Sequence, residues 1–159
     1  MRTFIKHVMS TSGSTAPWYA SLPAPRGTPL QMAVSELKAL KDDPARRAGV
    51  DYLVVDVRRA DMDEPDGKMI IPGAINLPAQ TFHQTLPTLL PVLSRIPRVI
   101  FHCSSSNGRG PRCAGWYQDA LDDHENDRST TTGDISKSYV LTGGIKAWKS
   151  AYPDDVQPL

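Results

Sequence analysis

Short apolar runs alternate with amphipathic segments along the middle and the end of the chain. Residues 52–57 and 98–102 are rich in β-branched and aromatic side chains, which predicts strands buried on both faces, and residues 139–141 predict a third strand. Apolar residues at helical spacing occur in residues 110–121 and again after Gly144. Strands that alternate with helices predict an α/β fold, with a central parallel sheet and helices on both faces.

Capping and helix-breaking residues predict the limits of the smaller helices. Ser35 is a good N-cap residue, so we expect a short helix that starts there and ends near Pro44. Residues 79–94 have helical periodicity, but Pro87 and Pro91 interrupt it. This segment is therefore expected to form two short amphipathic stretches rather than one helix.

The remaining segments predict turns, loops and an N-terminal arm. Residues 70–78 contain a Pro-Gly turn followed by a short strand, and the polar residues 124–137 predict an exposed loop. Four prolines and no acidic residue occur in residues 1–29, which we expect to form a partly flexible arm. Residues 30–155 then form a single catalytic domain, as suits a chain of 159 residues.

The composition is that of an ordinary globular protein and excludes several classes of function. The net charge is +1 and the pI is about 7.8, so no general positive field points to nucleic acid or to a membrane surface. Two cysteines are too few for a disulfide framework, which predicts a cytosolic or nuclear protein; the basic, hydroxyl-rich N-terminus makes mitochondrial import a weaker alternative. His7, His83 and His124 show no metal-ligand spacing with either cysteine, so neither a metal nor another cofactor is expected.

The segment that follows the second predicted strand carries the chemistry. His102 ends the strand and a helix is expected to start near Gly110, so the loop between them lies over a helix N-terminus, where unpaired N–H groups and the dipole favour an anion. The loop residues are small or flexible and can form a nest of inward-facing amides, in which Asn107 and Gly108 are expected to take a positive φ. The predicted oxyanion-binding loop consists of Ser104, Ser105, Ser106, Asn107, Gly108 and Arg109.

Cys103 and Arg109 are the predicted catalytic residues. A helix N-terminus and nearby cations lower the pKa of a thiol from about 8.5 to as low as ~3.5, so we expect Cys103 to act as a thiolate nucleophile. Arg109 offers a planar fork to two oxygens of a tetrahedral oxyanion and stabilises the extra negative charge of a transition state. The alternative is that Cys103 is a small buried apolar residue, which is the commonest role of an unpaired cysteine.

The loop resembles that of the cell-division-cycle dual-specificity phosphatases and of the eukaryotic arsenate reductases related to them. The shared pattern is His-Cys, five residues, then Arg-Gly-Pro and Arg or Lys, and residues 102–112 match it, with Ser106 as the serine inside the loop. Residues 54–58 resemble the Asp-Val-Arg strand end of this group, and residues 71–76 resemble its Ile-Pro-Gly-Ala turn. Residues 139–148 resemble the strand, Gly-Gly turn and Trp helix that close rhodanese domains. The resemblance implies a single rhodanese-like α/β domain.

The resemblance also implies four functions that share this loop. The leading hypothesis is a cysteine-dependent phosphatase that forms a phosphocysteine intermediate on a phosphorylated protein or a small phosphate. The first alternative is an arsenate reductase, with glutathione as co-substrate and glutaredoxin as a partner. A sulfurtransferase is a further alternative, although sulfurtransferases of this fold usually have a loop one residue shorter. The last is a non-catalytic module that binds phosphorylated partners.

Two loop positions depart from the phosphatase pattern. Gly108 occupies a position at which the phosphatases carry a glutamate, and Ser104 occupies one at which they often do. Because a general acid contributes about 10²–10⁴ in rate, slow hydrolysis of poor leaving groups is expected. The other candidates for this acid belong to a segment whose simpler interpretation is a solvated acidic loop: Asp61, Asp63, Glu64 and Asp66.

Four further residues are predicted to support the loop, and the second cysteine, Cys113, is considered beside them. His102 either tunes the thiolate through hydrogen bonds or is a structural histidine. Asp56 and Arg58 are expected to brace the loop, and Arg112 either adds positive potential, binds substrate or is a surface residue. Cys113 is a candidate resolving thiol, but packing is the preferred role, because its helical position does not ensure the approach that a disulfide needs.

Overall fold

Five parallel strands form the central sheet in the order β1-β6-β5-β2-β4. The computed structural model describes residues 15–59, 68–127 and 136–159. The strands are β1 (Leu30–Met32), β2 (Leu53–Asp56), β4 (Ile75–Asn76), β5 (Arg98–His102) and β6 (Lys137–Leu141). The three strands that were predicted from their apolar runs, β2, β5 and β6, occupy the centre of the sheet, which confirms the parallel α/β fold.

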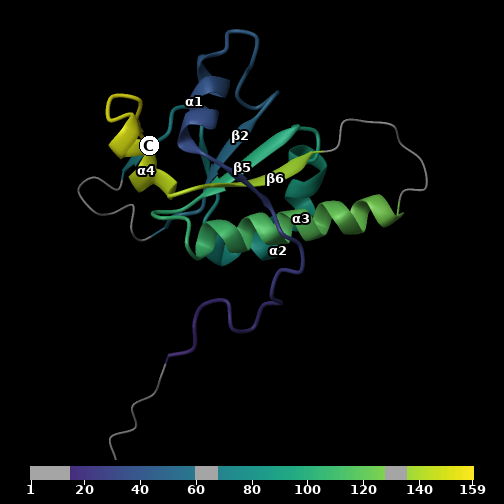
Figure 1. Cartoon of the computed structure of the whole chain (residues 1–159). Coiled ribbons are helices and arrows are strands. Elements are labelled where there is room, and N and C mark those ends of the chain that lie inside the picture. Colours follow the sequence, from purple (N-terminus) through teal and green to yellow (C-terminus); the bar gives the residue numbers. More distant parts are fainter. Residues whose placement is uncertain (1–14, 60–67, 128–135) are drawn as a thin grey trace, which may run out of the picture.

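Two helices cover each face of the sheet (Figure 1). α1 (Val34–Asp42) and α4 (Gly144–Ala151) lie on one face, and α2 (Ala79–Leu93) and α3 (Arg109–Asp127) lie on the other. β3 (Met69–Ile70) and β7 (Gln157–Pro158) form a separate two-stranded antiparallel sheet. Within the described segments, none of the helices combines the length and the apolar character that crossing a bilayer requires.

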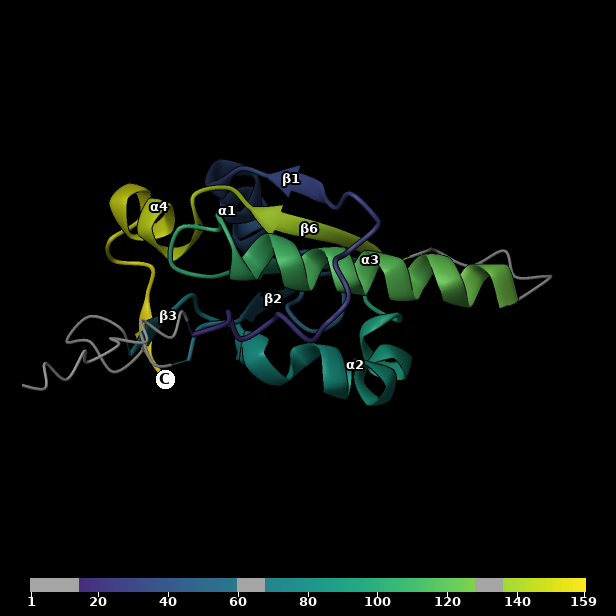
Figure 2. The ribbon, with the colours of Figure 1, turned by 90° about the horizontal axis from the view of Figure 1, so that it is seen from below.

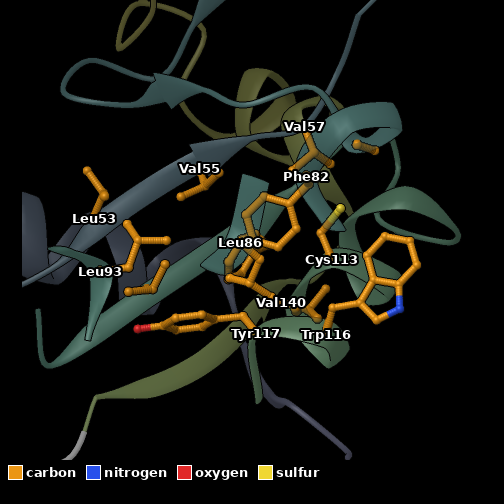
Figure 3. Packing of buried hydrophobic residues seen from close by; sticks show 14 of the residues in the cluster. Leu53, Val55, Val57, Phe82, Leu86, Leu93, Cys113, Trp116, Tyr117 and Val140 are labelled. Carbon is orange, nitrogen blue, oxygen red and sulfur yellow. The ribbon is translucent and has the colours of Figure 1, made fainter. Parts of the chain in front are cut away.

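The alternation of side chains along β2 divides the core into two clusters. Leu53 and Val55 point to the face covered by α2 and α3, whereas Val54 points to the face covered by α1 and α4. Figure 3 shows the first cluster, in which Phe82 of α2 and Tyr117 of α3 pack beneath the strands. Because both faces are covered, every residue of β2 is buried, as the continuous apolar run predicted.

α2 corrects the prediction of two short amphipathic stretches, since it is one helix of 15 residues. Pro87 and Pro91 both lie inside it, and both are exposed to solvent. Each proline removes one backbone hydrogen bond, but the two are four residues apart on the side facing water. The opposite side buries Phe82 and Leu86, and this tertiary packing keeps the helix continuous.

The start of α1 also differs from the prediction. The N-cap residue is Ala33, and Ser35 lies inside the first turn. The cap is closed by Glu36, whose carboxylate accepts a hydrogen bond of 2.7 Å from the Ala33 N–H. The expectation that Ser35 caps the helix is therefore wrong, because a carboxylate in the first turn satisfies this amide instead.

α3 is longer than the apolar pattern indicated. It continues to Asp127, so the prediction of a loop over residues 124–137 is wrong for its first four residues, and it is also wrong for Lys137, which begins β6. Residues 128–135 lie outside the described part of the chain. The same holds for residues 60–67, which include the acidic loop with the four candidate acids.

The described part of the N-terminal arm runs past α3 and α2 before the chain enters β1 (Figure 2). The Trp116 indole N–H donates a hydrogen bond of 2.8 Å to the Pro23 carbonyl. Farther along α3, the Asp119 carboxylate accepts hydrogen bonds from the backbone amides of Arg26 (2.8 Å) and Gly27 (2.6 Å). Residues 15–29 are thus tied to α3, and a division of the chain at residue 30 stays a prediction.

Candidate active site

Cys103 lies at the carboxyl end of β5, where the chain leaves the centre of the sheet. The loop that follows ends at Arg109, the first residue of α3. The Gly110 N–H, in the first turn of α3, donates a hydrogen bond of 3.4 Å to the Cys103 Sγ. An amide donor at a helix N-terminus interacts favourably with negative charge, so the predicted order of strand, cysteine, loop and helix is realised. The cysteine residue itself is only 3% exposed.

The start of α4 holds the first two loop residues from the other side. The Cys103 carbonyl accepts a hydrogen bond of 3.1 Å from the Ile145 N–H, and the Ser104 carbonyl accepts one of 3.0 Å from the Lys146 N–H. Gly144 permits this contact, because a Cβ atom there would lie only 2.5 Å from the Cys103 carbonyl oxygen. The Gly-Gly turn was predicted only as a turn, and its role as an anchor for the loop was missed.

The backbone of the loop turns at a residue other than those predicted. Ser106 has a φ of +55°, whereas neither Asn107 nor Gly108 has a positive φ. The prediction for these two residues is therefore wrong. Asn107 and Gly108 are exposed, whereas Ser106 is buried, so the turn occurs on the inner side of the loop.

Asp56 and Arg58 form a buried ion pair at the end of β2, next to β5. The Arg58 Nη2 donates a hydrogen bond of 2.7 Å to Asp56 Oδ2, and its Nε donates one of 3.0 Å to Oδ1. Arg58 also donates to the Met69 carbonyl at 2.9 Å. Since Asp56 pairs with His102 in the sheet register, the ion pair lies beside the strand end that carries the loop. This position fits the predicted bracing role, which stays a prediction.

His102 is fully buried beneath the loop. Its Nδ1 lies 3.1 Å from the Cys103 carbonyl oxygen, and its Nε2 lies 3.9 Å from Asp56 Oδ2. Burial lowers the pKa of the imidazole below its ordinary value, and the Asp56 charge only partly opposes this effect. A neutral ring can donate from Nδ1 to the carbonyl, so His102 is placed to hold the backbone of Cys103.

Arg112 points towards the arm. Its guanidinium lies 3.6 Å from the centre of the Tyr19 ring and 6.0 Å from that of Trp116. Such stacking stabilises a cation through the ring quadrupole. The structure therefore shows a packing contact for this side chain, and a contribution of its charge to substrate binding stays a prediction. No feature of the sequence had indicated Tyr19 as its neighbour.

Cys113 lies in the apolar cluster on the α2 and α3 face, as Figure 3 shows. Its side chain is completely buried. Burial raises the pKa of the Cys113 thiol far above its ordinary value, and the proximity of Cys103 adds to the effect. These surroundings agree with the preferred packing role, because a buried neutral thiol is a poor nucleophile.

A cavity of about 480 Å³ lies apart from the cysteine loop, between α2, α3 and the arm. Its lining includes His83, Leu86 and Trp116 and contains no residue of the segment 103–109. Across the described segments, no group of three or more His, Cys, Asp or Glu side chains is placed to hold a metal ion.

The five-stranded parallel sheet and a cysteine loop between its central strand and a helix define a rhodanese-type α/β protein. The model of the rhodanese-like domain family matches residues 33–151, and the chain belongs to this family. This match confirms the predicted fold class and extends from α1 to α4.

Relatives of the chain are named for more than one activity. The chain is 31% identical over 98 residues to arsenate reductase 2.2 of Oryza sativa subsp. japonica. The aligned region covers 59% of this chain and 72% of the relative. It is 28% identical over 108 residues to dual specificity phosphatase ibp1 of Schizosaccharomyces pombe, with 62% and 75% covered. The homologues therefore include arsenate reductases and phosphatases, as the resemblance of the loop implied.

Solved structures of the same group superpose on most of the chain. The As-Sb reductase from Leishmania major has 26% sequence identity and a TM-score of 0.56, with 80% of this chain and 84% of the other covered. Saccharomyces cerevisiae Ygr203w, a homolog of single-domain rhodanese and of the Cdc25 phosphatase catalytic domain, has 25% identity and a TM-score of 0.59, with 79% and 83% covered. Both superpositions cover about four fifths of this chain.

Proposed function

We propose that the protein is an enzyme in which Cys103 attacks a tetrahedral oxyanion, and that arsenate is its substrate. The observation that carries the proposal is the hydrogen bond from the Gly110 N–H to the Cys103 Sγ, at the start of α3 and next to Arg109. In this arrangement the sulfur faces a helix N-terminus, and the guanidinium that follows in sequence can hold two oxygens of the anion.

Among the described residues, which leave out the acidic segment 60–67, the acids near Cys103 favour arsenate over phosphate esters as the substrate. Hydrolysis of an alkyl phosphate requires an acid that protonates the leaving oxygen. The loop contains no carboxylate, and Asp56, at the end of the neighbouring strand, is engaged by Arg58. Arsenic–oxygen bonds exchange readily with water, so replacement of an arsenate oxygen by sulfur depends less on such an acid. Curated relatives named as arsenate reductases support the same choice.

The proposed reaction forms and breaks an arsenic–sulfur bond. The Cys103 thiolate displaces one arsenate oxygen, which takes up protons and leaves as water. Two thiols of an external donor such as glutathione then supply two electrons, become a disulfide and release arsenite together with the Cys103 thiolate. Glutaredoxin is the expected protein partner in this second half, because it exchanges thiols with glutathione disulfides.

Phosphatase activity is the second candidate, and it uses the same loop. The Cys103 sulfur would attack phosphorus, an aryl alcohol would leave, and water would release phosphate from the phosphocysteine. The similarity to dual specificity phosphatase ibp1 favours this candidate. Aryl phosphates are the expected substrates, since their leaving groups need little help from an acid.

Three assays of the purified protein and of Cys103→Ser separate these candidates. We expect the wild type to reduce arsenate with glutathione and glutaredoxin, to hydrolyse p-nitrophenyl phosphate slowly and to form no thiocyanate from thiosulfate and cyanide. The Cys103→Ser variant should lose all activity. Activity that survives in this variant would reject the cysteine mechanism. A persulfide on Cys103 would indicate sulfur transfer. A wild type without activity in all three assays would favour a binding module.

A further inference from the structure

Ser106 combines two energetically unfavourable features at one position of the loop. Among the residues that the structure describes, it is the one non-glycine residue with a positive φ, +55°. Its hydroxyl is buried, the residue being 9% exposed, and it makes no hydrogen bond to any described group. A left-handed backbone and an unpaired buried hydroxyl both lower stability.

The hydroxyl lies on the inner side of the loop, close to the sulfur-bearing residue. A methyl group placed on Gly110 would come within 3.3 Å of the Ser106 Oγ and of the Cys103 backbone nitrogen. The Gly110 nitrogen itself lies 3.4 Å from the Cys103 Sγ. Glycine at position 110 therefore leaves space for the serine hydroxyl beside the group that the proposed reaction requires.

A residue that serves only the fold would be expected to have a paired side chain. Unfavourable backbone and side-chain states of this kind concentrate at functional sites, where a ligand relieves them. A serine hydroxyl has three staggered positions about χ1, so it can turn towards a bound anion without a backbone movement. Hydrogen bonds of catalytic sites also shorten commonly when the ligand binds.

We propose that the Ser106 hydroxyl donates a hydrogen bond to an oxygen of the tetrahedral oxyanion when the loop binds one. This inference rests on the proposed function, in which the loop binds arsenate or phosphate. It adds a side-chain donor to the backbone amides of the loop. It also explains why a serine, rather than a glycine, occupies the position with positive φ.

The test compares Ser106→Ala and Ser106→Gly with the wild type, using arsenate without thiol and tungstate as probes. Both variants should bind the two oxyanions about tenfold more weakly, because a hydrogen bond to a charged group is lost. Without a ligand, Ser106→Gly should unfold about 2 °C above the wild type, since both unfavourable features are removed. Ser105→Gly is the control for added flexibility, and it should unfold below the wild type.

The outcomes separate this inference from the proposed function. Wild-type affinity in both Ser106 variants, or a lower unfolding temperature in Ser106→Gly, overturns the inference and leaves the oxyanion loop intact. A wild type that binds neither arsenate nor tungstate overturns the proposed function, and the inference fails with it. Weaker binding together with a higher unfolding temperature supports the inference, because a purely structural residue would change both quantities in the same direction.

Discussion

Cys103 and Cys113 lie ten residues apart, and their surroundings predict different reactivities. Cys103 follows the end of β5 and, although it is only 3% exposed and belongs to the same apolar cluster as Cys113, its sulfur accepts a hydrogen bond from the Gly110 amide. Cys113 is completely buried, and burial raises its pKa. Iodoacetamide at neutral pH is therefore expected to label the native wild type once, at Cys103. Peptide mass mapping locates the label. The Cys103→Ser variant is the unlabelled control, and urea-unfolded wild type is the doubly labelled control. Labelling of Cys113 in the native protein would contradict the prediction.

The buried His102 predicts a dependence of stability on pH. Its pKa is lowered in the folded protein, whereas an unfolded histidine titrates near 6.5, so the unfolded chain binds more protons as the pH falls below that value. This residue should therefore reduce the free energy of unfolding by about 1.4 kcal/mol per pH unit below 6.5, until the folded pKa is reached. Urea unfolding between pH 7.5 and 5.5 measures the slope. His102→Asn keeps a donor for the Cys103 carbonyl but does not titrate, and an unchanged slope in this variant would refute the prediction.

At the scale of elements, the contact between α4 and the loop depends on Gly144. It has a φ of +61°, and a Cβ atom would lie 2.5 Å and 2.6 Å from the carbonyl oxygens of Cys103 and Ser104. Gly144→Ala should therefore separate α4 from the loop, lower the unfolding temperature and greatly reduce oxyanion binding. Gly49→Ala is the matched control, because Gly49 has a φ of +81° with nothing near its Cβ position, so only the backbone strain of ~1 kcal/mol is expected. Equal effects of the two substitutions would show that the close approach is unimportant.

The elements that were predicted correctly are those whose signal is local. β2 and β5 are read from continuous apolar runs, and the order of strand, Cys103, loop and helix follows from adjacent residues. The error over α2 concerns a feature that distant parts of the chain decide. α2 passes through Pro87 and Pro91 because its other side packs against the sheet, which no helix-breaking rule includes.

The same distinction applies within the candidate site. Cys103 and Arg109 could be singled out from their spacing and from the strand before them. The anchoring of the loop by α4, and the neighbour of Arg112, depend on contacts between segments far apart in the sequence. The turn at Ser106, rather than at Asn107 or Gly108, was missed because local preference was the only guide.

At the scale of the whole molecule, the candidate site is assembled from three layers of structure. The sheet supplies Cys103 at the end of its central strand, α3 supplies the Gly110 amide and Arg109, and α4 holds the loop from the opposite face. The arm is attached to α3 along the same side as Arg112. A change in the arm can therefore reach the first turn of α3 without touching the loop.

One polar attachment of the arm, the Asp119 carboxylate, holds two backbone amides and can be removed by a single substitution. Asp119 is 14% exposed, and its two carboxylate oxygens accept hydrogen bonds from the Arg26 and Gly27 amides. Asp119→Ala should lower the free energy of unfolding by about 2 kcal/mol, because two backbone amides lose charged acceptors. Trp18 and Trp116 should then become more exposed as the arm loosens, which red-shifts the fluorescence and speeds proteolysis of residues 15–29.

A control on the same helix distinguishes loss of the anchor from a general loss of negative charge on α3. Asp122 is exposed, and the side-chain hydrogen bond that it accepts comes from Gln118, one turn earlier on the same helix. Asp122→Ala should therefore change the free energy of unfolding by less than about 0.5 kcal/mol and leave the fluorescence unchanged. If Asp119→Ala behaves like Asp122→Ala, the arm is held by its other contacts, which include the Trp116 hydrogen bond to Pro23 and the Arg26–Asp123 ion pair, and the two amides are satisfied equally well by water.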